Sequence, residues 1–431
     1  MFKRFISEHR KSNEEKHSTA DKVCMVVWNT FETDARVTKE AKSLIKLGKK
    51  VTVIAVFEPK RTKKHEEKDS INIIRIDRTI LKKKELSQVP SSNSIKSNHV
   101  HHINTEKKSN PIKKRIRSIL KSVYGLIPKT MINIRFFLYA MKQDATIYHA
   151  HDLNTLVPTY LVAKIKGAKI VYDAHEVSTD RAGWKNKRLW TKIESFLIRR
   201  VDHVITTNDT RAEFFSEQYN IPVPTVIRNV PPLQYVSKTD KLRKQCNISI
   251  DEPIVLYQGG IQRDRGLENI IRCIPLVPKG IFIFLGNGSL KPKIIALAKE
   301  LKVEDRTRFI DAVPNEELLT YTASADIGMQ LLQNTCFNHY SACSNKIHEY
   351  LMAGLPVVAS DLPEIRKVVS SSHIGLIVNP DDLEMVAKSI NTLINNEELY
   401  KELQGNTKEA ALLHHWDIEE GKLHKIYNFL K

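Results

Sequence analysis

The chain has 431 residues, of which 41% are hydrophobic, and a formal net charge of +19. This length is enough for two domains of ordinary size that each bury a core. No apolar run approaches the ~20 residues needed to cross a bilayer, and the charged first residues lack the apolar core of a signal peptide, so we expect a cytoplasmic protein. The five cysteines form no CxxC pair, which argues against a disulfide framework and a structural zinc site.

The positive charge is concentrated in the front third of the chain. Residues 1–150 contain 33 Lys+Arg and 15 Asp+Glu, a surplus of 18, whereas the other 281 residues contain 35 and 34, a surplus of 1. This asymmetry indicates an anionic partner, either a membrane surface or a nucleic acid.

The front of the chain has the pattern of a parallel sheet. Residues 22–57 read as a buried strand, a helix from about Asp34 to a stop at Gly48, and a second buried strand, which together form a βαβ unit. A further strand follows at 71–76, and over about 78–124 the chain becomes basic and rich in Ser and Asn, as in a surface insertion. Within this insertion, 112–124 has apolar residues at helical spacing among Lys and Arg. That pattern is typical of a helix on a membrane surface, or of an ordinary surface helix.

Two further series of alternating strands and helices follow. The first continues the front sheet, and a polar linker over 234–252 precedes the second. We predict strands at 145–151, 168–175, 202–208, 224–229, 254–260, 280–288, 307–310, 326–332, 355–360 and 375–378, with helices between them, over 382–413 and in the tail. The predicted fold is α/β, with two doubly wound Rossmann-like domains facing a central cleft. The expected parts are a basic tail (1–21), a first domain (22–230), a second domain (231–410) and a C-terminal helix (411–431) that packs back toward the first domain.

Several residues that follow strands are suited to hold a phosphate, because ligands of open parallel sheets bind beyond the carboxyl ends of the strands. Gly259 and Gly260 permit close approach of backbone, and Arg265 precedes a helix whose amide groups can receive a phosphate. Lys346 begins another helix, where a cation is unfavourable unless an anion binds nearby. We therefore expect Arg265 and Lys346 to hold a diphosphate. Glu349, one turn farther along, would hold vicinal hydroxyls such as those of a ribose.

These residues lie in motifs that resemble a known family. The stretch "NKIHEYLMAGLPVVASD" (345–361), preceded by "LYQGGIQRDRG" (256–266) and "IFLGNGSL" (283–290), resembles the GT-B glycosyltransferases of family 4, which are retaining enzymes that use nucleotide sugars. The resemblance extends from residue 22 to the C-terminal helix. It implies that Glu349 holds the donor ribose, that Arg265 holds the diphosphate, and that His175, in "YDAHE", faces the transferred sugar.

We accordingly predict His175, Arg265 and Lys346 as catalytic residues. The predicted substrate-binding residues are Gly259, Gly260, Arg263, Glu349, Asn345, Gly286, Gly288, His151, Asp152, Glu176 and Arg36. For several of these a structural role is the alternative: His151 and Asp152 either line the site or cap a helix, and His175 and Glu176 either act on substrate or only support the strand end.

Two positions depart from the family pattern. Members often carry a second Glu eight residues before the ribose-binding one, and this chain has Ser341 there. The usual Arg directly after the glycine pair is absent, and Arg263 is our candidate to supply that charge. We interpret both departures as variation within the family and not as loss of activity.

The resemblance implies a sugar transfer with the anomeric configuration kept. Fixed cations would stabilise the leaving diphosphate, so we expect neither a cofactor nor a metal. The expected partners are a nucleotide sugar donor, a lipid-linked or glycan acceptor in cell-surface polysaccharide synthesis, and the anionic inner face of the cell membrane. Alternatives are a nucleotide-sugar epimerase of the same fold, a non-catalytic nucleotide-sugar-binding protein, or a nucleic-acid-binding protein. The last is disfavoured because the basic region lacks interleaved aromatic residues.

Overall fold

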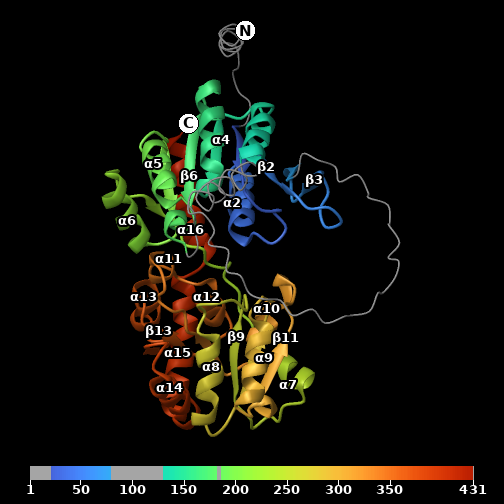
Figure 1. Cartoon of the computed structure of the whole chain (residues 1–431), viewed down its shortest axis with the longest axis vertical. Helices are drawn as coiled ribbons and strands as arrows, with labels where there is room; N and C mark the ends of the chain where they lie inside the picture. Colours follow the sequence, from blue (N-terminus) through green and yellow to red (C-terminus); the bar gives the residue numbers. More distant parts are fainter. Residues whose placement is uncertain (1–20, 79–129, 182–185, 431) are drawn as a thin grey trace, which may run out of the picture. The chain divides into compact units, whose positions relative to one another are not determined.

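A computed structural model describes residues 21–78, 130–181 and 186–430 of the chain (Figure 1). By its internal contacts the chain divides into two compact units. The first comprises residues 1–34 and 48–170, and the second comprises residues 35–47 and 171–431. No helix among the described residues is both long and apolar enough to cross a membrane.

The first unit contains a sheet whose strands follow the order β3-β4-β2-β1-β5. Their bounds are Lys22–Val26 (β1), Lys50–Phe57 (β2), His65–Lys68 (β3), Ile71–Asp77 (β4) and Ile147–His151 (β5). The three inner pairings are parallel, and these strands are rich in buried Val and Ile, as expected for a sheet covered on both faces. The edge strand β3 runs antiparallel to β4. It was not predicted, because its sequence HEEK is charged throughout, which is common at a sheet edge.

Helices of the first unit are α4 (Leu153–Lys166) and a helix over residues 130–141. The predicted basic helix at 112–124, residues 1–20 of the predicted tail (1–21) and most of the predicted insertion lie outside the described residues.

The second unit begins with α2 and a group of parallel strands. Its front elements are α2 (Ala35–Lys46), β6 (Lys169–Ala174), α5 (Lys187–Ile198), β7 (His203–Thr206), α6 (Asp209–Tyr219) and β8 (Thr225–Val226). The strands β6, β7 and β8 pair in parallel. The C-terminal helix α16 (Trp416–Phe429) packs on α2, where the indole N–H of Trp416 donates to Ser43 Oγ at 2.9 Å.

The remainder of the second unit is built on a six-stranded parallel sheet of order β11-β10-β9-β12-β13-β14. The strands are Ile254–Gln258 (β9), Ile281–Leu285 (β10), Thr307–Ile310 (β11), Ile327–Gln330 (β12), Val357–Ser360 (β13) and Gly375–Val378 (β14). The helices are Lys241–Cys246 (α7), Leu267–Cys273 (α8), Lys291–Glu300 (α9), Asn315–Thr322 (α10), Phe337–Tyr340 (α11), Asn345–Met352 (α12), Pro363–Ser371 (α13), Leu383–Asn395 (α14) and Glu397–Leu413 (α15).

This sheet has a hydrophobic core on each face, because successive side chains of a strand point to opposite sides. Val255 and Tyr257 of β9 belong to a cluster with α8, α9 and α14, whereas Ile254 and Leu256 belong to a cluster with α12 and α13. The two parallel-sheet regions confirm the predicted α/β fold class.

Two helices of this region, α7 and α11, were not predicted. Helix α7 lies within 234–252, which we expected to be a linker, and α11 is a single turn. Helix α13 is amphipathic, begins with Pro363 and buries Ile365, Val368 and Val369. Its signal was present in the sequence, since proline is favoured in the first turn of a helix.

Candidate active site

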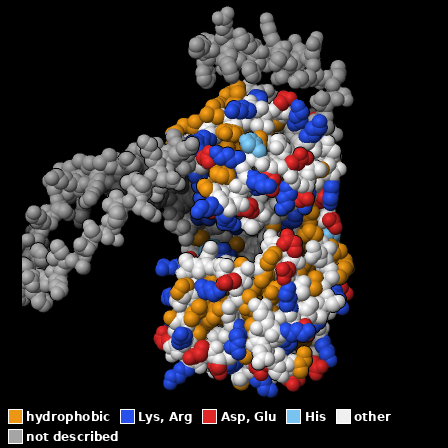
Figure 2. All heavy atoms as spheres, turned by 90° about the vertical axis from the view of Figure 1, so that its right-hand side faces the viewer, with side chains coloured by type: hydrophobic (Ala, Val, Ile, Leu, Met, Phe, Trp, Pro, Cys, Tyr) orange, Lys and Arg blue, Asp and Glu red, His pale blue; other side chains and the backbone are white. Residues whose placement is uncertain are grey.

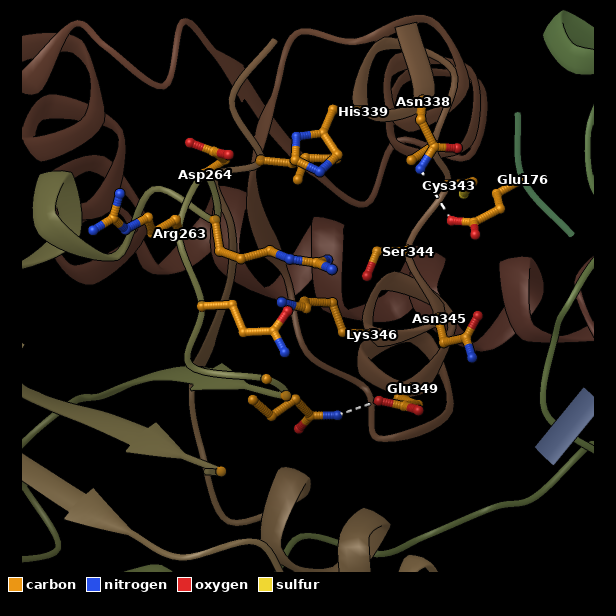
Figure 3. Close-up of a pocket in the computed structure, with 18 of the residues that line it drawn as sticks. Glu176, Arg263, Asp264, Asn338, His339, Cys343, Ser344, Asn345, Lys346 and Glu349 are labelled. Carbon is orange, nitrogen blue, oxygen red and sulfur yellow. Dashed lines mark hydrogen bonds between the residues drawn. The ribbon is translucent and has the colours of Figure 1, made fainter. Parts of the chain in front are cut away.

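A cavity of about 960 Å³ lies at the carboxyl ends of β9 and β10 in the second unit (Figure 3). It is lined by the loops after these two strands, the start of α12, α11 and the segment that follows β6. The cavity brings together most of the predicted site residues, namely His175, Glu176, Gly259, Gly260, Arg263, Arg265, Gly286, Asn345, Lys346 and Glu349.

The glycines after β9 and β10 allow two loops to touch through their backbones. A Cβ atom on Gly286 would lie 2.0 Å from the carbonyl oxygen of Gly259, and one on Gly288 would lie 2.0 Å from that of Ile261. Hydrogen bonds from Gly259 N to Leu285 O (2.9 Å) and from Ile261 N to Asn287 O (3.0 Å) join the loops. Gly286 and Gly288 therefore shape the cavity floor by letting the β9 loop approach closely.

Two cations face this floor. Lys346 is 6% exposed, and its Nζ lies 3.8 Å from the centre of the Tyr257 ring, a cation–π contact. Burial, together with the nearby Arg265, lowers the pKa of Lys346 well below its usual value. Neither Lys346 nor Arg265 forms an ion pair with any described residue. We call Arg265, Lys346 and the first turn of α12 the cationic wall.

Glu349 lies one turn beyond Lys346 on α12 and is held by a short chain of hydrogen bonds. Its Oε2 accepts from Gln258 Nε2 at 2.6 Å, the bond dashed at Glu349 in Figure 3. Gln258 Oε1 accepts in turn from Thr322 Oγ1 at 2.7 Å. Burial raises the pKa of Glu349, against the lowering effects of Gln258 and Lys346. Gln258, the last residue of β9, thus fixes the orientation of this carboxylate.

His175 follows β6 and is oriented by a buried carboxylate. Its Nε2 lies 3.0 Å from Asp173 Oδ2, so the ring donates this N–H to Asp173. Asp173 also accepts from Arg36 at 2.9 and 2.8 Å, and Arg36 forms an ion pair with Glu40. Burial and the neighbouring Asp173 raise the pKa of Glu40, against the lowering effect of Arg36. Arg36, which is 2% exposed, therefore supports Asp173 and, through it, His175.

A second arginine, missed in the sequence, joins His175 to α11. The buried Arg211 of α6 donates to the carbonyl of His175, to Asn338 O (3.1 Å) and Oδ1 (3.0 Å), and to Ser341 Oγ (3.2 Å). Asn338 Nδ2 donates in turn to Glu176 Oε2 at 3.2 Å (Figure 3). We call His175, Glu176, Arg211 and Asn338 the hydrogen-bonded wall.

Ser341 stands where the family often has a glutamate. It is fully buried, and its hydroxyl donates to Phe337 O at 2.9 Å while accepting from Arg211. The serine therefore belongs to the Arg211 network and not to the surface of the cavity.

Some predicted residues are not among those that line the cavity. Arg36 and Gly288 act through other residues, as described above. His151 and Asp152 belong to the first unit. His151 is 2% exposed and stacks on His149 with ring centres 4.2 Å apart, and Asp152 has a φ of 62°.

The two halves of the chain match two family models. Residues 35–230 match the model described as Glycosyltransferase Family 4, and residues 238–410 match the model described as Glycosyl transferases group 1. The chain belongs to the group 1 glycosyltransferases. This result confirms the resemblance inferred from the sequence motifs.

Individual relatives of this glycosyltransferase are distant. A glycogen synthase of Mycobacterium tuberculosis is 23% identical over 261 residues, which is 58% of this chain and 60% of that protein. A D-inositol 3-phosphate glycosyltransferase of Xylanimonas cellulosilytica is 24% identical over 191 residues, 43% of this chain and 44% of the relative. The chain thus spans less than two thirds of the length of these relatives.

Solved structures resemble the glycosyltransferase over nearly its whole length. Sucrose-phosphate synthase of Thermosynechococcus elongatus has a TM-score of 0.74 at 17% identity, covering 95% of this chain and 99% of that one. Anabaena HepE in complex with UDP-glucose has a TM-score of 0.69 at 14% identity, with the same coverage. These similarities confirm the GT-B fold.

Proposed function

We propose that this protein is a retaining glycosyltransferase that moves a sugar from a nucleoside diphosphate sugar to a lipid-linked or glycan acceptor in cell-surface polysaccharide synthesis. The observation that carries the proposal is the cationic wall. Arg265 and Lys346 line one cavity with the start of α12, and neither forms an ion pair with a described residue. Burial and the like charge of Arg265 disfavour the charged form of Lys346, and Glu349 offsets this only in part, so a diphosphate is a suitable ligand.

In this proposal the cationic wall stabilises the leaving group. As the bond from the sugar to the diphosphate breaks, negative charge grows on the phosphate oxygens. Arg265, Lys346 and the amide groups at the start of α12 stabilise that charge without reorganising. Fixed cations of this kind supply the electrostatic role that a divalent metal has in other enzymes, so the proposed reaction needs no metal.

The remaining residues place the two ends of the donor. The Glu349 carboxylate, oriented by Gln258, accepts hydrogen bonds from the ribose hydroxyls. His175, oriented by Asp173, faces the transferred sugar. No nucleophilic carboxylate is required, because a departing phosphate oxygen can take the acceptor proton on the face from which it leaves, which keeps the anomeric configuration.

The solved relatives support the class of donor. The HepE structures contain UDP or UDP-glucose, and the other relatives are named for sugar-transfer reactions.

We also propose that the protein associates with the inner face of the cell membrane. The support is the charge surplus of residues 1–150 and the basic pattern of 112–124, a segment outside the described residues. On the face drawn in Figure 2, Lys and Arg side chains are mixed with Asp and Glu.

The test is donor turnover by the purified protein. Nucleotide sugars are offered one at a time, with and without an extract of membrane lipids, and nucleoside diphosphate release is measured in the presence of EDTA. We expect one donor to be turned over, with stimulation by the extract and no inhibition by EDTA. Tight nucleotide binding without release from any donor would contradict the proposal and favour a non-catalytic binding protein.

A further inference from the structure

The outer face of α5 carries a dense group of cations. Arg188, Lys192 and Arg199 follow one another at helical spacing on its exposed side, with Arg200 and Lys187 at its two ends. Together with Thr191, Ser195, Phe196, Gln218 and Tyr219 they line a cavity of about 850 Å³. Among the described residues that line this cavity, none is acidic.

Two acidic residues close to this face in the sequence are already engaged. Glu194 of α5 is fully buried and accepts hydrogen bonds from the hydroxyls of Tyr172 (2.6 Å) and Tyr219 (2.7 Å). Asp180 forms an ion pair with Lys187. The charges of Arg188, Lys192 and Arg199 are therefore not balanced by an acid of the cavity lining, and the face is strongly positive.

Apolar side chains lie among these cations. Leu189 is 51% exposed and follows Arg188 on α5, and Phe196 is 55% exposed and lines the same cavity as the basic row. The guanidinium of Arg200 lies 3.7 Å from the centre of the Phe196 ring, and its Nη1 donates to the carbonyl of Phe196 at 2.6 Å. A basic helix face with exposed Leu and Phe matches the pattern of helices that lie in the interface of a bilayer.

We propose that the outer face of α5 docks on the surface of an anionic lipid bilayer. The cations contact the lipid phosphates, and Leu189 and Phe196 enter the boundary between head groups and acyl chains. Segments of this same chain are poor occupants of the face. Residues 79–129, for example, contain 12 Lys+Arg and 2 Asp+Glu, and a surface of the same sign would repel them.

This inference goes beyond the membrane association proposed above, because it assigns a second docking surface in the described part of the second unit. It rests on the proposed function only in one respect: docking would bring the enzyme to a lipid-linked acceptor held in the membrane. Lipid binding and sugar transfer can be measured separately, so either can fail without the other.

The experiment is co-sedimentation of the full-length protein with vesicles of phosphatidylcholine, with and without 30% phosphatidylglycerol. The triple variant Arg188→Gln, Lys192→Gln, Arg199→Gln is compared with a control that loses the same charge elsewhere in the second unit, Lys388→Gln, Lys401→Gln, Lys408→Gln. Each cation near an anionic leaflet contributes to the free energy of binding. We therefore expect the partition coefficient of the α5 variant onto anionic vesicles to fall by about tenfold or more. The control variant should bind as the unchanged protein does.

A second variant tests the apolar part of the face. Phe196→Ser, an exposed position, should weaken binding to anionic vesicles severalfold while leaving the circular dichroism spectrum unchanged. Equal binding of the α5 triple variant, the control and the unchanged protein would overturn the proposal. So would retention of a DNA duplex through Arg188, Lys192 and Arg199 without any binding to vesicles. Donor turnover in detergent, measured in parallel, should be the same in all variants, so a loss of vesicle binding is not mistaken for failure of the proposed reaction.

Discussion

The two walls of the cavity are built in opposite ways. The residues of the hydrogen-bonded wall are joined to one another across α6, α11 and the segment after β6, His175 through its backbone carbonyl. Arg265 and Lys346 of the cationic wall have no ion-pair partner among the described residues, and Lys346 only faces an aromatic ring. A wall satisfied by its own contacts can hold a geometry without a ligand, whereas a wall of unpaired cations is completed by an anion. We therefore expect the hydrogen-bonded wall to position the reacting groups and the cationic wall to bind the diphosphate.

The largest effect should come from His175 on the hydrogen-bonded wall. His175→Ala is expected to lower turnover by a factor of ~100 or more while leaving nucleoside diphosphate affinity nearly intact. Steady-state kinetics and calorimetry measure the two quantities. His373→Ala, an exposed histidine of the same unit, is the matched control. If the His175 variant turned over donor as fast as the control, His175 would have only a structural role at the end of the strand.

The cationic wall should show the reverse behaviour. Arg265→Ala or Lys346→Ala removes a charge-assisted phosphate contact of about 1.5–3 kcal/mol, so nucleoside diphosphate affinity should fall at least about tenfold. Arg272→Ala, on the exposed side of α8, removes the same charge away from the cavity and should leave affinity unchanged. Unchanged affinity in both cationic-wall variants would show that the diphosphate binds elsewhere.

The same wall predicts a pH dependence of binding. Burial and Arg265 hold the pKa of Lys346 low in the empty cavity, and a bound diphosphate raises it. Between these two pKa values the protein takes up a proton on binding. Affinity should therefore fall as pH rises through that window, by at most about tenfold per pH unit. Calorimetry in buffers of different ionisation enthalpy measures the uptake, which should vanish in Lys346→Met. An unaltered pH slope in that variant would assign the proton to another group.

The smallest effect is expected at Ser341. Ser341→Ala removes the acceptor of Arg211 Nε, a hydrogen bond worth about 0.5–1.5 kcal/mol, and loosens the support of His175 by a comparable amount. Turnover should fall severalfold with no change in nucleoside diphosphate affinity. If affinity fell as much as turnover, the separation between the two walls would be wrong.

The sequence reveals the cationic wall more readily than the hydrogen-bonded wall. Lys346 was predictable because a cation at the start of a helix is a local anomaly that calls for an anion. Arg211 gives no local signal, since its partner Ser341 lies 130 residues away and is brought close only by packing. Gly286 and Gly288 lie between these cases. Glycines at these positions indicate that another group packs closely against the backbone. Only the structure shows that this group is the loop after β9.

Most strands of both sheets were predictable because, like Lys346, they carry a signal that is local in the sequence. Runs of Val and Ile such as those of β2 and β9 are local patterns. The charged edge strand β3 and the short helix α11 lack such a pattern, and they form because neighbouring elements offer hydrogen bonds. Asp180, for instance, accepts from the backbone N–H of Phe337 at 2.8 Å.

The packing of α16 on α2 makes the two sequence-distant helices depend on each other. Tyr427 of α16 is fully buried, and burial, with smaller contributions from the nearby Glu40 and Asp173, raises the pKa of its hydroxyl, so the last helix lies close to the carboxylates that support His175. A fragment that stops at residue 410 would uncover this group, although it retains every residue that lines the cavity. Fragments for separate expression should therefore keep α2 and α16 together, and clipping by a protease ahead of Trp416 would disturb a histidine more than two hundred residues away in the sequence.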